Sequence, residues 1–473
     1  MKVEQIYTGC LAEAAYYIES NGEALVIDPL REPGPYLEKA AGDKARIKYI
    51  LETHFHADFV SGHQELAEKT GATIVFGPTA EPGYPAHIAT DGEELALGNV
   101  TIKVLHTPGH TPESSTYLLR NEEGRDVAIF TGDTLFIGDV GRPDLVQKLK
   151  PEITQDYLAG LLYDSLRNKI MPLADDVIVY PGHGAGSACG KNLGSQTMDT
   201  LGHQKQYNYA LNPNMSRTAF IKAVTEGLVE PPQYFPHNVL MNLKGGLPQV
   251  SDVVKQGTRP LNPLEFQVLG EAENAIILDT RSEAEFAKAY IPGSVFIGLN
   301  GSFAPWAGAL LTDMKQAILL VTPEGREEET VVRLSRVGYD NPIGYLNGGM
   351  EEWQAAGNST ESIEEISAEE FAAAYKNNPR INLVDVRRES EYESMHLTGA
   401  VNFPLDFIYR NMKKLDKDKK YYIHCAGGYR SVIAASILKA NGYSEIINIK
   451  GGFAALSSTG LPKSEYKVQQ TML

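Results

Sequence analysis

Short apolar runs bounded by glycine, proline and polar residues recur along the first half of the chain. Such runs are typical of β-strands, and we expect strands at 24–28, 72–76 and 100–104. Glycine and proline turns and loops rich in histidine separate them. We therefore expect residues 1–255 to form a mixed α/β domain whose loops carry polar chemistry.

The second half of the chain alternates strand-like runs with helical patterns. Residues 317–321 and 421–424 are strand-like, whereas 432–438 has the apolar spacing of a helix. This alternation indicates a parallel sheet with helices on both faces. The stretch 248–263 between the two halves has a loop-like composition, and we expect the domain boundary there, near residue 255.

The second half contains one domain twice. An apolar strand that ends in Asp-x-Arg occurs at 277–281 and again at 383–387, each time before a helix start. Two further pairs of segments match in the same order, and they are 291–295 with 397–401 and 346–350 with 449–453. We expect two copies of one α/β domain, at 262–358 and 363–465.

Length, charge and cysteine content narrow the classes of function. At 473 residues the chain is long enough for about three domains. Its 43 Lys and Arg against 60 Asp and Glu give a net charge of −17, which disfavours nucleic acid and anionic lipid as partners. Three cysteines, no signal-like N-terminus and no long apolar stretch lead us to expect a cytoplasmic protein without a membrane partner.

Histidine and aspartate follow the ends of four expected strands in the first domain. Imidazole and carboxylate groups that converge beyond strand ends are typical metal ligands. We therefore expect a metal site built from these side chains, which are His54, His56, Asp58, His110, Asp133 and His183.

These residues resemble the metallo-β-lactamase superfamily, whose signature is H-x-H-x-D-H followed by further His, Asp and His ligands. The resemblance implies an αββα sandwich, here followed by two α/β domains with parallel sheets. The binuclear hydrolases of this superfamily have a second histidine after the aspartate, where this chain has Phe59. Phenylalanine cannot bind a metal, so the resemblance favours a mononuclear centre over glyoxalase II-like thioester hydrolysis.

The same motifs are similar to those of the persulfide dioxygenases, a branch of the superfamily. This similarity implies that His54, His110 and Asp133 bind one Fe(II) per chain as a facial triad. It also implies that the remaining three residues of the set, His56, Asp58 and His183, hold ligand tautomers and bound waters. The similarity also implies that Arg142, in a G-R-x-D segment, and Cys189 lie on the substrate side. Arg142 could instead form a structural salt bridge, and Cys189 could instead be a buried inert thiol.

Cys425 lies between an expected strand and an expected helix. Backbone N–H groups of such a loop and the positive end of the helix lower a thiol pKa and stabilise thiolate or persulfide sulfur, and Gly427 and Gly428 let the loop close around the sulfur. The segment resembles the rhodanese family of sulfurtransferases, which implies that Cys425 and Arg430 are catalytic. Four residues separate Cys425 from Arg430, whereas related phosphatases have five, so the spacing favours sulfur transfer over phosphatase action.

The first copy of the repeat has Thr322 where the nucleophile would be and Pro323 where an amide donor would be. Threonine cannot hold a persulfide sulfur, so we expect a rhodanese-like domain without sulfur chemistry.

Both constellations fit one pathway. We expect iron-dependent oxidation of a small-molecule thiol persulfide by O2 to sulfite, and rhodanese transfer of sulfur to sulfite to give thiosulfate, in a homo-oligomer. Two alternatives remain open, a glyoxalase II-like zinc thioester hydrolase and a non-oxidative sulfur-relay protein.

Overall fold

The computed structural model of the chain describes residues 1–191 and 193–467. It divides into two compact units, and the main boundary falls between Val250 and Ser251.

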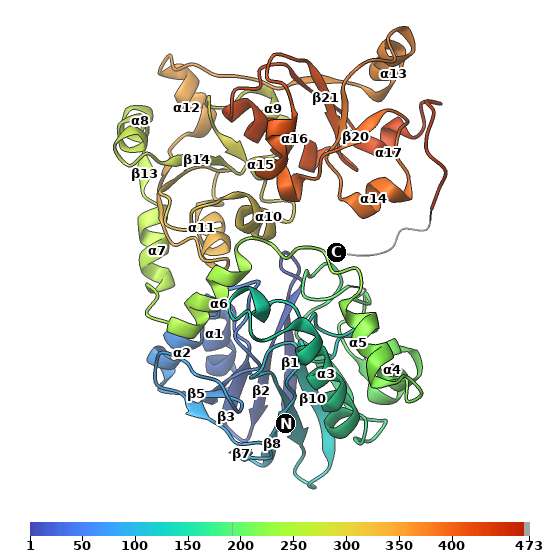
Figure 1. Cartoon of the computed structure of the whole chain (residues 1–473). Helices are drawn as coiled ribbons and strands as arrows, with labels where there is room; N and C mark the ends of the chain where they lie inside the picture. The colour runs from blue at the N-terminus through green and yellow to red at the C-terminus, as the bar shows by residue number, and fades with distance from the viewer. Residues whose placement is uncertain (192, 468–473) are drawn as a thin grey trace. The chain divides into compact units, whose positions relative to one another are not determined.

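The first unit is built on two six-stranded sheets (Figure 1), with strand orders β1-β2-β3-β4-β5-β6 and β12-β11-β10-β9-β8-β7. The pairs β3–β4, β4–β5 and β10–β11 are parallel, so their carboxyl ends meet at one edge of each sheet. The first sheet comprises β1 (Lys2–Thr8), β2 (Glu13–Ser20), β3 (Glu23–Ile27), β4 (Arg46–Glu52), β5 (Thr73–Phe76) and β6 (His87–Ile88). The second comprises β7 (Glu94–Leu97), β8 (Val100–His106), β9 (Ser115–Arg120), β10 (Asp126–Gly132), β11 (Ile178–Pro181) and β12 (Asp199–Thr200).

Both faces of each sheet are buried, because helices cover the outer faces. Along β2, Tyr16 and Ile18 pack between the sheets, while the alternate residues Ala15 and Tyr17 pack against the helices, as the two-residue period of a strand requires. The first sheet is covered by α1 (Gly34–Gly42) and α2 (His63–Thr70). The other helices of this unit are α3 (Gln155–Ser165), α4 (Leu201–Tyr207), α5 (Arg217–Thr225) and α6 (Phe235–Lys244). Three short helical segments are η1 (Val146–Lys148), η2 (Leu166–Ile170) and η3 (Tyr209–Leu211). The predicted αββα sandwich is confirmed.

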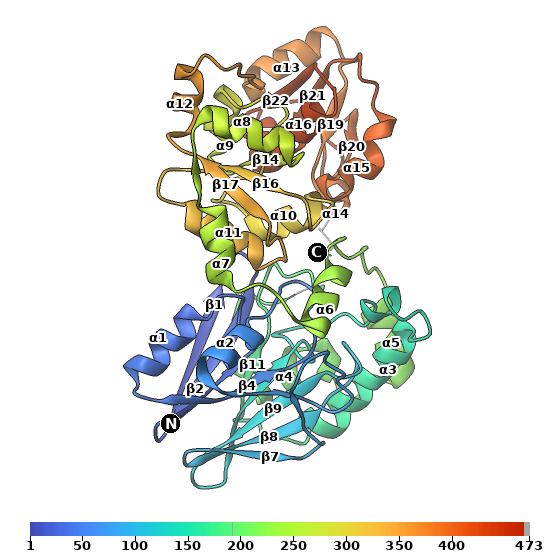
Figure 2. The same cartoon turned by 90° about the vertical axis from the view of Figure 1, so that its left-hand side faces the viewer.

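The second unit contains two five-stranded parallel sheets (Figure 2), with the equivalent orders β13-β17-β16-β14-β15 and β18-β22-β21-β19-β20. Two rhodanese-like α/β domains with parallel sheets were predicted, and this part of the fold class is also confirmed. The first domain has β13 (Pro260–Leu261), α8 (Pro263–Ala272), β14 (Ile276–Asp279), α9 (Glu283–Lys288), β15 (Val295–Phe296), α10 (Phe303–Leu310), β16 (Ile318–Val321), α11 (Glu327–Ser335), β17 (Pro342–Leu346) and α12 (Gly349–Ala355). The second has β18 (Glu364–Ile366), α13 (Ala368–Asn377), β19 (Leu383–Asp385), α14 (Glu389–Ser394), β20 (Ala400–Asn402), η4 (Leu405–Phe407), α15 (Ile408–Asn411), η5 (Met412–Lys414), β21 (Tyr421–His424), α16 (Tyr429–Ala440), β22 (Ile446–Ile449) and α17 (Gly452–Leu456).

The Asp-x-Arg motif makes the same bonds in both copies. Arg281 Nη2 donates to Asp279 Oδ2 at 2.6 Å and to a backbone carbonyl at 2.8 Å. Arg387 Nη2 donates to Asp385 Oδ2 and to a backbone carbonyl at the same two distances. The repeat in the sequence is therefore a repeat of one folded domain.

The loop predicted for 248–263 is wrong over part of its length, because Val250–Gly257 forms helix α7. Val250, Val253 and Val254 have the three- and four-residue spacing of one helix face, and Val250 and Val253 are buried. The prolines that flank the stretch suggested a loop, but they lie outside the helix.

No helix in the described part of the chain is long and apolar enough to cross a membrane.

Candidate functional site

The predicted metal-binding side chains come from loops after four strands. His54 follows β4, His110 follows β8, Asp133 follows β10 and His183 follows β11. Each of these residues is at most 2% exposed. Segments far apart in the chain therefore bring their polar side chains together in the interior of the first unit.

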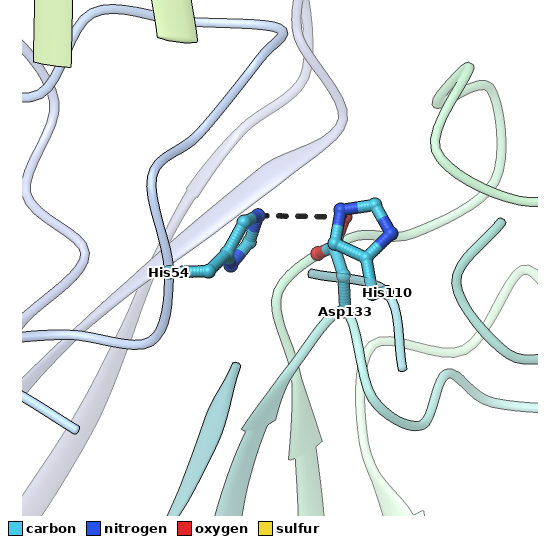
Figure 3. Close-up of side chains that lie close together, drawn as sticks. All are labelled: His54, His110 and Asp133. Carbon is cyan, nitrogen blue, oxygen red and sulfur yellow. Dashed lines mark ion pairs between the residues drawn. The ribbon is translucent and has the colours of Figure 1, made fainter. Parts of the chain in front are cut away.

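His54, His110 and Asp133 face one another (Figure 3). His54 Nε2 lies 3.9 Å from Asp133 Oδ2, and His110 Nε2 lies 3.4 Å from the same oxygen. Because a metal binds imidazole nitrogen and carboxylate oxygen at about 2 Å, one ion can contact all three atoms. Two imidazoles and one carboxylate form a facial ligand set that leaves other coordination positions open.

The Asp133 carboxylate fits a bound cation. Both of its oxygens are buried, and neither has a hydrogen-bond partner within the described residues. Burying a carboxylate without compensation is costly, and a cation held by Asp133 and the two histidines would compensate it. The donor set therefore fits a metal ion.

Thr53 and Asp28 decide which His54 nitrogen faces the site. The Thr53 hydroxyl donates to Asp28 Oδ2 at 2.8 Å, and the Thr53 N–H donates to Oδ1 at 2.7 Å. Because that hydroxyl proton is in use, the Thr53 oxygen accepts from His54 Nδ1, 2.9 Å away, and Nε2 keeps its lone pair. Burial lowers the pKa of His54 well below its ordinary value, and nearby His56 adds to this effect, so the ring is neutral, as a metal ligand must be.

A backbone carbonyl orients His110 in the same way. His110 Nδ1 donates to the Arg142 carbonyl oxygen at 2.8 Å, which leaves Nε2 free. Gly141 permits this approach, because a Cβ there would lie 3.0 Å from His110 Nδ1 and 2.1 Å from the Asp133 carbonyl oxygen. The G-R-x-D segment therefore supports the site through its backbone.

The Arg142 side chain is bonded within the protein. Its Nε and Nη2 donate to Asp144 at 2.7 and 2.8 Å, and it also donates to the carbonyl oxygens of Ala188 and Val229. These bonds show that Arg142 forms a structural ion pair with Asp144. Its contact with substrate stays a prediction.

His56 belongs to a different group of side chains. Its Nε2 lies 3.1 Å from Asp28 Oδ1 and 3.4 Å from Glu52 Oε2, and the Phe59 ring packs on it at 4.2 Å between centroids. Burial disfavours charge on His56, but the two carboxylates outweigh burial and raise its pKa well above the ordinary value. Protonated imidazole has no lone pair for a metal.

Asp58, His183 and Cys189 form a second buried group next to Asp133. His183 Nε2 lies 3.4 Å from Asp58 Oδ2 and 3.5 Å from Asp133 Oδ1. The potential ligand atoms of Asp58, His183 and Cys189 lie within 4.8 Å of one another. Burial raises the pKa of the Cys189 thiol, and the charges of Asp58 and Asp133 raise it further. Sequence reasoning did not join Cys189 to this group, because no local pattern links the loops involved.

Cys425 lies where the sequence places it, between β21 and α16. The Gly428 N–H donates to Cys425 Sγ at 3.0 Å. The Ser431 hydroxyl lies 3.6 Å from the same sulfur and donates to the Gly428 carbonyl oxygen at 2.9 Å. Gly428 has a φ of +124°, which favours glycine, and Gly427 is exposed on the outside of the loop. The buried sulfur therefore faces an amide donor and the start of a helix, which stabilise a thiolate.

The segment 451–454, which contains the second pair of adjacent glycines in this domain, packs against this loop. The Phe453 N–H donates to the Cys425 carbonyl oxygen at 2.7 Å, and the Ala454 N–H donates to the Ala426 carbonyl oxygen at 3.0 Å. Gly452 has a φ of +55°, and a Cβ there would lie only 2.5 Å from the Cys425 carbonyl oxygen. Glycine is therefore required for the approach.

Arg430 is clamped by Glu391. Its Nη1 and Nη2 donate to Glu391 Oε2 and Oε1 at 2.6 and 2.8 Å. Burial would raise the pKa of Glu391, but Arg430 outweighs burial and lowers it. Sequence reasoning assigned Arg430 a catalytic role, which stays a prediction, and missed Glu391 as its partner.

The equivalent loop of the middle domain holds a carboxylate in place of sulfur. Glu327 Oε1 accepts from the Gly325 N–H at 3.1 Å and from the Thr322 hydroxyl at 3.4 Å. Pro323 has no N–H to offer. An acidic side chain of the chain itself therefore uses the donors of this loop.

Comparison with known proteins assigns the parts of the chain. Residues 8–183 match the metallo-beta-lactamase superfamily, and residues 262–356 and 367–459 match the rhodanese-like domain. A crystal structure of a metallo-beta-lactamase from Staphylococcus aureus subsp. aureus COL aligns with a TM-score of 0.63 and 31% identity, over 73% of this chain and 98% of that one. The chain belongs to the metallo-β-lactamase superfamily and carries two rhodanese-like domains.

Curated relatives of the first unit include both hydrolases and dioxygenases. The cytoplasmic hydroxyacylglutathione hydrolase of Arabidopsis thaliana is 32% identical over 179 residues, which are 37% of this chain and 65% of that protein, just under two thirds. The hydroxyacylglutathione hydrolase GloC of Haemophilus influenzae is 30% identical over 40% of this chain and 87% of its own length. The human mitochondrial persulfide dioxygenase ETHE1 is 29% identical over 48% of this chain and 80% of its own length.

Proposed function

We propose that the first domain is an iron-dependent persulfide dioxygenase and that the last domain transfers sulfur through Cys425. In the first reaction a small-molecule thiol persulfide, O2 and water give the thiol, sulfite and two protons. In the second, sulfite attacks the outer sulfur of a Cys425 persulfide, the S–S bond breaks, and thiosulfate leaves. Cys425 takes the bonding electrons and returns to the thiolate form.

One observation carries the proposed iron chemistry. The ligand atoms of His54, His110 and Asp133 lie within 4.8 Å of one another, while His56 Nε2 lies next to the carboxylates of Asp28 and Glu52. Fe(II) bound by two imidazoles and one carboxylate would supply open positions for O2 and the persulfide.

The residues around this set keep it in place. Thr53 and the Arg142 carbonyl hold the Nδ1 atoms of His54 and His110, which fixes both tautomers. His183 lies between the carboxylates of Asp58 and Asp133 and separates them. We also propose Cys189, which is buried beside Asp58 and His183, as a residue that contacts the substrate.

The proposed sulfur transfer is supported by the difference between the two rhodanese-like loops. The loop of the last domain directs an amide N–H at the sulfur of Cys425. The loop of the middle domain has Thr322 at this place, and Glu327 uses its donors. Of these two loops, the one with Cys425 combines a thiol with an N–H donor that stabilises its negative charge.

A zinc thioester hydrolase is the second candidate, because relatives of the first unit include hydroxyacylglutathione hydrolases. Such an enzyme needs a second metal. Phe59 offers no ligand, and the carboxylates of Asp28 and Glu52 outweigh burial and raise the pKa of His56, which favours the protonated ring. Burial raises the pKa of Cys189, which favours a thiol over the thiolate that binds metals. These features favour the mononuclear centre.

Metal analysis combined with oxygen measurement tests the proposal. We expect the anaerobically purified chain to hold about one iron and to consume O2 with persulfides of glutathione, coenzyme A or bacillithiol. Two zinc ions per chain with thioester hydrolysis would contradict the dioxygenase. Sulfur loading of Cys425 without any oxygen uptake would instead indicate a non-oxidative relay.

A further inference from the structure

The first residue of helix α16 is bonded to the other rhodanese-like domain. Tyr429 follows Gly428, whose N–H donates to the Cys425 sulfur, and its own hydroxyl donates to the Gly298 carbonyl oxygen at 2.8 Å. Its ring also meets the Phe296 ring edge-on, with centroids 6.0 Å apart. The residue next to the sulfur-binding amide is therefore anchored outside its own domain.

The middle domain is shaped to receive this helix. Gly301 leaves room for the Tyr429 ring, since a Cβ there would lie 2.3 Å from ring carbon Cζ. Phe296 belongs to the edge strand β15, and its N–H donates to Ser436 Oγ at 3.0 Å. Tyr429 and Ser436 are two helical turns apart, so one face of α16 makes both contacts. The helix therefore supplies an acceptor for an N–H of an edge strand.

We propose that the middle domain, which has no sulfur nucleophile, positions the sulfur-binding loop of the last domain through Tyr429. This inference rests on the proposed sulfur transfer at Cys425. The Gly428 N–H stabilises negative charge on Sγ only while it points at the sulfur, because hydrogen bonds weaken steeply with misalignment. Two adjacent glycines make the loop flexible, and the anchor at Tyr429 restrains the end of the loop that carries this amide. Tyr429 is a positioning residue that acts through Gly428.

Three substitutions in the full-length chain test this role. Tyr429→Phe removes the hydrogen bond to Gly298 and keeps the ring. Gly301→Ala displaces the same ring from the middle-domain side. Tyr443→Phe is the matched control, because the Tyr443 hydroxyl donates to the Met412 carbonyl oxygen at 2.6 Å, within the last domain and away from the loop.

The reactivity of Cys425 is the readout. Alkylation of the Cys425 peptide is followed by mass spectrometry across a pH series, and kcat and KM are measured for thiosulfate formation from sulfite and a persulfide. We expect Tyr429→Phe and Gly301→Ala to move the alkylation profile to higher pH. We expect both to lower kcat about five- to tenfold, the effect of weakening one hydrogen bond, with little change in KM. Tyr443→Phe should match the wild type, and oxygen uptake should be unchanged in all three.

Wild-type alkylation profiles in both Tyr429→Phe and Gly301→Ala would overturn the proposal. An equal shift in Tyr443→Phe would also overturn it, because general loosening of the domain would then explain the effect. If wild-type Cys425 takes up no sulfur, the proposed transfer fails, but the alkylation profiles still decide whether the middle domain positions the loop.

Discussion

The metal centre and the Cys425 loop are built in opposite ways. The metal centre takes its three proposed ligands from loops after three strands and orients the two histidines with separate partners, Thr53 for His54 and the Arg142 carbonyl for His110. The Cys425 loop uses one reactive side chain and directs at its sulfur an N–H from the same strand–helix junction. The ligands of the first centre therefore come from segments far apart in the chain, whereas the second centre has one reactive residue in one loop, whose shape other segments support.

The middle domain illustrates the consequence of this difference. It keeps the sheet order and the Asp-x-Arg bonds of the last domain, yet Thr322, Pro323 and Glu327 replace the sulfur site. Chemistry that depends on one loop can be lost without a change of fold. A change of one ligand would also abolish the metal centre. The residues that orient its ligands, however, come from segments throughout the first unit.

Removing a metal ligand should have the largest effect. His110→Ala deletes one of two imidazoles and should abolish iron retention and oxygen uptake, as measured by metal analysis of the anaerobically purified chain. Thiosulfate formation from sulfite and a persulfide should continue, because Cys425 needs no metal. The exposed His87→Ala variant is the control and should keep its iron. Full iron content in His110→Ala would show that the ligand set is wrong.

The two rhodanese-like loops should differ completely in sulfur loading. After treatment with a persulfide, peptide mapping should find an added sulfur on Cys425 and none within 262–358. Thr322→Cys should remain unloaded, because Glu327 already uses the donors of that loop and Pro323 offers none. A sulfur adduct in the middle domain of the unmodified chain would mean that the two copies were aligned incorrectly.

These outcomes depend on features that the sequence shows to different degrees. The strand ends that carry His54, His110, Asp133 and Cys425 were predictable, because reactive residues directly follow apolar runs. The bonding of Asp28 to Thr53 and of Tyr429 to Gly298 was not, because each joins segments that only folding brings together. The helix at 250–257 was missed because flanking prolines outweighed a short apolar pattern.

Removing His56 should weaken the first unit more than it weakens metal binding. His56→Ala leaves Asp28 and Glu52 buried without the cation between them, which should lower the free energy of unfolding by about 3–5 kcal/mol. Some iron should be retained, because His56 is not one of the proposed ligands. Oxygen uptake should be slower, because Asp28 then holds Thr53 less firmly. Denaturant unfolding and metal content measure the two effects. Complete loss of iron in a folded His56→Ala protein would make His56 a ligand.

The smallest effect should come from the support of His54. Thr53→Val keeps the shape of the side chain but removes the hydroxyl that fixes the His54 tautomer, and iron affinity should fall about tenfold. Competition with an iron chelator measures this change. Thr53→Ser keeps the hydroxyl and should retain iron like the wild type. Equal affinity in all three proteins would show that Thr53 does not support the metal centre.

Oxygen uptake and product analysis of Cys425→Ser give the decisive measurement of the proposed division of labour. Serine cannot carry a sulfur, whereas the proposed iron site needs only persulfide, O2 and Fe(II). We predict that Cys425→Ser consumes O2 near the wild-type rate and releases sulfite in place of thiosulfate. Asp133→Ala should do the converse, losing oxygen uptake while still making thiosulfate from added sulfite and persulfide. If Cys425→Ser stops oxygen uptake altogether, sulfur must pass through Cys425 before it reaches the iron, and the proposed order of the two reactions is contradicted.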